Sequence, residues 1–100
     1  MVEVKELKIG ETYAQGILIR EPGGENHPNM IVIECKRGYL MCGYLNMDAA
    51  GKFGDAAVLV GGADFDAVLK NPIKGMTKAA EEAGVKEGMT GAEAAEVLNA

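Results

Sequence analysis

The stretch Gly38-Tyr39-Leu40-Met41-Cys42-Gly43-Tyr44-Leu45-Asn46 marks the point at which the chain changes character. Before it, short runs rich in β-branched and aromatic residues are separated by glycine, a pattern typical of strands joined by turns. After it, alanine becomes frequent and the apolar period lengthens, which indicates helices. The stretch therefore predicts the end of an antiparallel meander and the start of a region in which helices and strands alternate.

Four strands are expected in the first half of the chain. They are Val2 to Ile9, Tyr13 to Arg20, Met30 to Cys35 and Tyr39 to Tyr44. Residues 21–28 hold two prolines and two glycines, and this composition predicts a loop between the second and third strands. Lys36-Arg37-Gly38 is expected to close the following hairpin, with Gly38 supplying a positive φ.

The second half of the chain is expected to contain four short helices and one buried strand. The helices are Met47 to Ala50, Phe65 to Lys70, Lys78 to Ala83 and Gly91 to Asn99, and the strand is Ala56 to Val60. Each helix is preceded by a residue whose side-chain oxygen can cap it: Asn46, Asp64, Thr77 and Thr90. Thr90 and Glu93 also have the spacing of a capping box. The order strand, helix, strand, helix in this half of the chain implies at least one parallel crossover. The predicted fold class is therefore α+β, an antiparallel meander that continues into a mixed sheet with short helices mainly on one face.

Composition limits the class of protein. A chain of 100 residues has room for one domain, here residues 1–100, and its 48% hydrophobic and 25% charged residues are ordinary for a globular protein. The net charge of −5 leaves no basic stripe for a phosphate backbone, so nucleic acid is not an expected partner. The sequence shows neither a signal peptide nor an apolar stretch of membrane-spanning length. We therefore expect a cytosolic protein without a membrane partner, whose two cysteines are reduced.

Three segments carry a resemblance to a known family. They are residues 38–45, residues 66–73 and the helix starts between Thr77 and Ala94, among which the run Gly-Tyr-Leu-Met-Cys-Gly is the most specific. Together they resemble the YunC-like family, a small domain of unknown function found in bacteria and archaea. The resemblance covers nearly the whole chain. It implies a compact α/β domain and no assigned activity.

Cys42 is the candidate catalytic residue. A thiol becomes a nucleophile when a cation, a metal or a helix N-terminus stabilises its thiolate, and the helix start at Asn46 lies four residues further on. The only histidine, His27, lies in the preceding loop and is the weaker catalytic candidate. The alternative is that Cys42 is a small core residue, because unpaired cysteines are among the most buried residue types. Tyr39, Gly43 and Asn46, which flank Cys42, are the expected ligand-binding residues.

The register of the predicted hairpin decides between these two roles. If Cys35 faces Leu40, Cys42 shares the apolar face of Ile31 and Ile33; if Cys35 faces Tyr39, Cys42 moves to the opposite face. Neither register brings the two cysteines into disulfide geometry.

The remaining polar motifs predict structure and not chemistry. Gly61-Gly62-Ala63-Asp64 resembles the setting of a phosphate loop, but its aspartate is expected to be a helix cap. The aspartates Asp48, Asp55 and Asp66 lie in separate segments without the spacing of a calcium loop. We expect no metal site and no cofactor.

Two functions follow from these observations. The first is a non-catalytic module that forms a homo-oligomer and binds a small molecule or a protein. Apolar residues such as Val32 and Met41 alternate along their strands with other apolar residues, so both faces of the sheet require cover. The second is a thiol-dependent enzyme with Cys42 as the nucleophile. No complete set of catalytic groups is evident, which favours the first.

Overall fold

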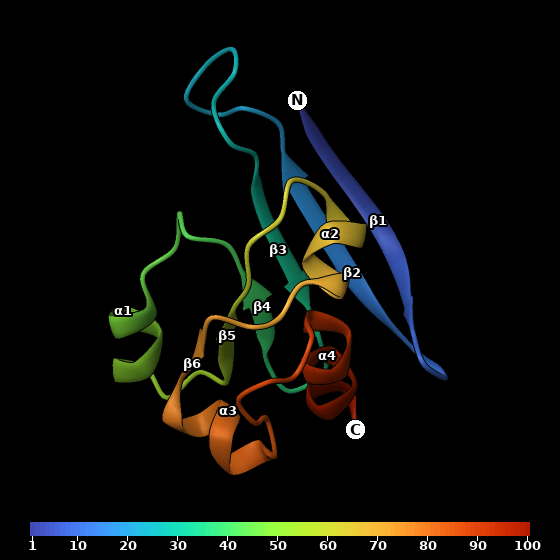
Figure 1. The fold of residues 1–100 in the computed structure, drawn as a ribbon, viewed down its shortest axis with the longest axis vertical. Coiled ribbons are helices and arrows are strands. Elements are labelled where there is room, and N and C mark those ends of the chain that lie inside the picture. The colour runs from blue at the N-terminus through green and yellow to red at the C-terminus, as the bar shows by residue number, and fades with distance from the viewer.

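In the computed structural model, which describes all 100 residues, six strands form one mixed sheet (Figure 1). In order across the sheet, the strands are β1 (Val2–Ile9), β2 (Thr12–Ile19), β3 (Met30–Glu34), β4 (Tyr39–Met41), β5 (Ala57–Leu59) and β6 (Gly75–Met76). Every neighbouring pair is antiparallel except β4 and β5, which run parallel. The predicted α+β class, with a meander that continues into a mixed sheet, is therefore confirmed.

Four short helices begin at the predicted capping residues. They are α1 (Met47–Lys52), α2 (Phe65–Lys70), α3 (Lys78–Ala83) and α4 (Gly91–Asn99). Asn46, Asp64, Thr77 and Thr90 each accept a hydrogen bond from a backbone N–H in the first turn. Thr90 and Glu93 form the predicted capping box. These caps depend on residues a few positions apart, which explains why the sequence located every helix start.

The helices cover the two faces of the sheet unequally. On one face, which we call the inner face, α2, α3 and α4 enclose the main core, and its largest fully buried side chains are Ile31, Ile33, Leu40, Val58, Val60, Val85 and Leu98. On the opposite, outer face, α1 covers a separate small core of Met41, Ala50 and Ala57. Figure 1 shows α1 beside β4 and β5, away from β1 and β2. The helices therefore lie mainly on one face, as predicted.

The register of the strands arranges apolar residues in rows across the outer face. One row crosses β1 to β5 through Val4, Ile17, Val32, Met41 and Leu59. The next row crosses β1 to β3 through Val2, Ile19 and Met30. We call these eight residues the apolar rows. Val2 is 62% and Val4 59% exposed, so this end of the outer face is open to solvent.

The β3–β4 hairpin differs from both registers considered from the sequence. Cys35 lies opposite Gly38, with its N–H donating to the Gly38 carbonyl at 2.8 Å, and Glu34 faces Tyr39. This register is shifted by two residues from the pairing of Cys35 with Leu40, so Cys42 still shares a face with Ile31 and Ile33. The hairpin loop is thus only Lys36-Arg37.

The prediction that Gly38 has a positive φ is wrong. The φ angle of Gly38 is not positive. Glycine is required at this position because there is no room for a side chain. A Cβ at Gly38 would collide with the carbonyl oxygen of Ala56, which accepts a hydrogen bond from the Tyr39 N–H at 3.0 Å. The expected strand to Tyr44 also ends early, at Met41, because a turn follows in which the Leu45 N–H donates to the Cys42 carbonyl.

Candidate functional site

Cys42 lines a hollow of about 410 Å³ where β4 ends. The other lining residues are Pro28, Asn29, Gly43, Tyr44, Gly61 and Gly62, and we call this space the Cys42 hollow. Asn29 fixes one wall, because its side-chain amide donates to the Ala63 carbonyl at 2.8 Å and accepts from the Glu21 N–H at 2.9 Å. Two of the predicted site residues, Cys42 and Gly43, are therefore brought together.

The Cys42 sulfur is buried at the wall of this hollow. Cys42 is only 7% exposed, and its sulfur accepts a hydrogen bond from the Ile31 N–H at 3.4 Å. Asn46, four residues further on, begins the six-residue helix α1, which it caps by accepting from the Ala49 N–H at 3.0 Å.

His27 does not line the Cys42 hollow. It is exposed in the loop between β2 and β3, and its ring lies against Gly23 of the same loop. The neighbouring Pro28 lines the hollow and its carbonyl accepts from the Tyr44 hydroxyl at 3.4 Å. The structure therefore places the loop, but not the imidazole, beside Cys42.

Tyr39 and Asn46 line a different hollow, on the outer face. This space of about 430 Å³ lies between α1 and the strands β3 and β4, and it is lined by Val32, Tyr39, Met41, Leu45, Asn46, Ala49, Ala50, Phe53 and Asp55. We call it the α1 hollow. The Tyr39 hydroxyl donates to the Asp55 carboxylate at 2.8 Å. Burial and this carboxylate raise the pKa of Tyr39 above its ordinary value of 10.0.

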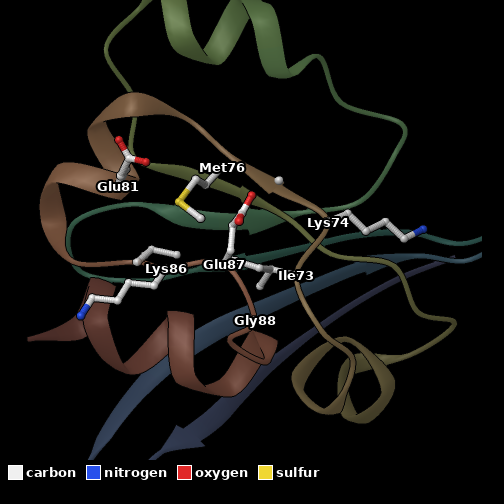
Figure 2. Close-up of a pocket in the computed structure, with 9 residues that line it drawn as sticks. Ile73, Lys74, Met76, Glu81, Lys86, Glu87 and Gly88 are labelled. Atoms are coloured by element: carbon white, nitrogen blue, oxygen red, sulfur yellow. The ribbon is translucent and has the colours of Figure 1, made fainter.

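The largest cleft, of about 800 Å³, lies beside β6 and contains none of the predicted site residues. Figure 2 shows Glu81 and Glu87 on either side of Met76, whereas the amines of Lys74 and Lys86 point away from the centre. The Lys74 amine instead lies against Gly61, since a Cβ at Gly61 would be 3.0 Å from its Nζ. Lys74 thus places a cation near the glycines of the Cys42 hollow. Lys74 and Gly61 are thirteen positions apart in the chain.

Cys35 is expected to be unreactive in the folded protein. Burial, together with the negative charge of Glu34, raises the pKa of Cys35 from 9.0 to about 11. At pH 8 its thiolate fraction is then on the order of one thousandth, and alkylation proceeds through the thiolate. In a Cys42→Ala variant we expect iodoacetamide at pH 8 to leave the folded protein unmodified by mass spectrometry and to modify it fully in denaturant. Rapid modification of the folded variant at pH 8 would contradict this assignment.

No three histidine, cysteine, aspartate or glutamate side chains lie close enough to form a metal-binding group. None of the helices has the length and apolar character needed to cross a membrane.

The family model, the curated protein and the solved structure that match this chain are all described without an activity. A family model described as a domain of unknown function, DUF1805, matches residues 41–98. The uncharacterized protein YunC of Bacillus subtilis (strain 168) is 34% identical over 71 residues, which cover 66% of this chain and 70% of the Bacillus protein. The crystal structure of a protein of unknown function, TA1206 from Thermoplasma acidophilum, matches with a TM-score of 0.85 and 28% identity over 98% of this chain and 93% of that chain.

Proposed function

We propose a non-catalytic role for this chain, which belongs to the YunC-like family described as the domain of unknown function DUF1805. It acts as a cytosolic module that associates with a second copy of itself through the outer face of its sheet. The open end of the apolar rows is the observation that carries this proposal.

The apolar rows have the character of an interface. An antiparallel sheet with one solvated face ordinarily alternates apolar residues on the core side with polar residues on the other. Here Val2 and Val4 are exposed on the outer side of β1, whereas Leu7 and Ile9 of the same strand belong to the core on the inner side. Contiguous exposed apolar surface of this kind marks a contact site.

The charge distribution is compatible with a second copy as the partner. The chain carries a net charge of −5, so two copies repel each other at long range, and a contact surface without carboxylates adds no close like-charge pairs to this repulsion. The apolar rows contain no charged residue, although a quarter of the chain is charged, whereas Glu6 and Glu34 stand in the adjacent row. A two-fold axis through the rows brings apolar surface together and leaves these carboxylates at the rim.

Sedimentation equilibrium tests the proposal. We expect the wild-type protein to be a dimer at micromolar concentration and Val4→Glu to be a monomer, because the substitution places a carboxylate in the centre of the contact. Lys5→Glu is the matched control: it lies next to Val4 on β1, is also exposed and points to the other face. A wild-type protein that is monomeric up to about 1 mM, or a Lys5→Glu variant that dissociates as Val4→Glu does, contradicts the proposal.

A second candidate function is a thiol-dependent enzyme that uses Cys42. The observation that favours it is the environment of the sulfur, which accepts the Ile31 N–H and lines a hollow whose glycines adjoin the Lys74 amine. In a Cys35→Ala variant, this function requires Cys42 of the folded protein to react with iodoacetamide at neutral pH. Resistance of Cys42 under these conditions excludes it as a nucleophile.

A further inference from the structure

We infer that Phe53 anchors the self-association by entering the α1 hollow of the second copy. This inference rests on the proposed function and identifies the part of the outer face that holds the two copies together. It follows from three observations: the position of the α1 hollow, the exposure of Phe53 and the charges that surround them.

The α1 hollow continues the apolar rows. Val32 and Met41 belong both to the row that crosses the sheet and to the lining of the hollow. Leu45 and Ala49 extend the same apolar surface onto α1 and the segment before it. A volume of about 430 Å³ lies within the range of about 300–1,000 Å³ for sites that enclose organic groups. The hollow is thus large enough for a phenyl ring and lies on the surface that the second copy covers.

Phe53 stands at the rim of this hollow with its side chain in solvent. The residue is 80% exposed, and its neighbours Lys52 and Gly54 are also exposed. Its backbone is fixed nonetheless, because its N–H caps the end of α1 by donating to the Ala49 carbonyl at 3.1 Å. An aromatic side chain held out on a fixed backbone has the properties of an interface anchor, since little conformational freedom is lost when it becomes buried.

Two-fold symmetry couples the rim to the hollow. In a symmetric dimer the same patch of each copy meets the other, and when the two-fold axis passes beside the rim of the α1 hollow, the ring of one copy faces the hollow of its partner. The charges are complementary in this arrangement. Lys52 is the residue before Phe53 and approaches the second copy together with it. In that copy, Asp55 lines the hollow and Asp48 is exposed on α1, so a lysine meets two carboxylates.

Three variants test this inference by sedimentation equilibrium. Phe53→Ala is expected to raise the dimer dissociation constant at least about 100-fold, as for an aromatic anchor lost from both halves of an interface. Ala49→Trp, which fills the hollow from its own side, is expected to weaken the dimer similarly while Phe53 is retained. Tyr44→Ala is the matched control, because Tyr44 is an exposed aromatic residue that lines the Cys42 hollow and not the α1 hollow. The dimer dissociation constant of this variant is expected to equal that of the wild-type protein.

The outcomes separate this inference from the proposed function. A monomeric wild-type protein overturns both. If the wild-type protein is a dimer, Val4→Glu dissociates it and Phe53→Ala does not, the inference about Phe53 is overturned and the proposed function stands. If Phe53→Ala dissociates the dimer and Ala49→Trp does not, the Phe53 ring binds outside the α1 hollow. This result overturns the assignment of the hollow. Circular dichroism of each variant monitors the fold, which the solvent-exposed Phe53 side chain is not needed to maintain.

Discussion

Replacing Thr77 with valine is expected to lower the free energy of unfolding by about 3 kcal/mol, because it leaves three backbone groups without a partner. The Thr77 hydroxyl accepts from the Ala57 N–H at 3.0 Å and from the Ala80 N–H at 3.3 Å, and it donates to the Asp55 carbonyl at 2.6 Å. The residue is only 6% exposed, so water does not replace these bonds. Valine keeps the shape and removes the oxygen. Urea denaturation at a fixed protein concentration measures the loss.

Thr90→Val is the matched control for this prediction. Thr90 follows the same Gly-Met pair and caps α4 as Thr77 caps α3. Its hydroxyl accepts from the Glu93 N–H and donates to the Glu93 carboxylate, and both bonds lie where solvent can replace them. The expected loss is about 1 kcal/mol, the ordinary value of a helix cap. Equal losses for the two variants would show that Thr77 acts as a helix cap only.

Gly38→Ala is expected to lower the free energy of unfolding by about 3 kcal/mol. The added methyl group would overlap the carbonyl oxygen of Ala56, a backbone atom held in place by its hydrogen bond from the Tyr39 N–H. Relief of this overlap requires β4 to move away from the segment that leads into β5, and overpacking of this kind costs about 1–3 kcal/mol or more. Chemical denaturation of the variant measures the effect.

Gly51→Ala provides the control for Gly38→Ala. Gly51 lies in α1, is exposed and has open space where its Cβ would be. Alanine there is expected to raise the free energy of unfolding by about 0.5–1 kcal/mol, since glycine is the weaker helix former. Destabilisation of both variants to the same extent would mean that the space at Gly38 is not the cause.

The parts of the fold that the sequence predicted are those determined by neighbouring residues. The helix starts at Asn46 and Asp64 depend on contacts within a single turn. The first four strands pair in chain order, so their sequence order also gave their order in the sheet. Patterns of this local kind are visible without knowledge of distant contacts.

Features that depend on distant residues were missed. The two-residue strand β6 exists because the N–H groups of Lys74 and Thr77 donate to carbonyls of β5, and no apolar run announces it. The buried Asn99 joins α4 to the two hairpins, accepting from the Lys36 N–H at 2.8 Å and donating to Thr12 at 3.0 Å. These partners are more than 60 residues away from Asn99, so no local pattern predicts them.

The candidate site divided for a related reason. Tyr39 and Cys42 lie three positions apart at the end of β4, and successive side chains of a strand point to opposite faces. Proximity in sequence grouped them with Asn46, whereas the structure assigns Tyr39 and Asn46 to the α1 hollow and Cys42 to the other. The odd separation of Tyr39 and Cys42 causes this division, and the register determines only which face of the sheet each residue takes.

The strand order has a consequence for how the chain folds. Each strand pairs with the strand made just before it, so the sheet can assemble in the order in which the strands are synthesised. The inner face, however, stays partly uncovered until α4, the last helix of the chain, packs against β1, β2 and β4 and buries Leu98. During synthesis a nearly complete sheet therefore precedes its own cover. We expect this interval, before α4 has covered its part of the inner face, to be the stage at which the nascent chain is most prone to aggregate.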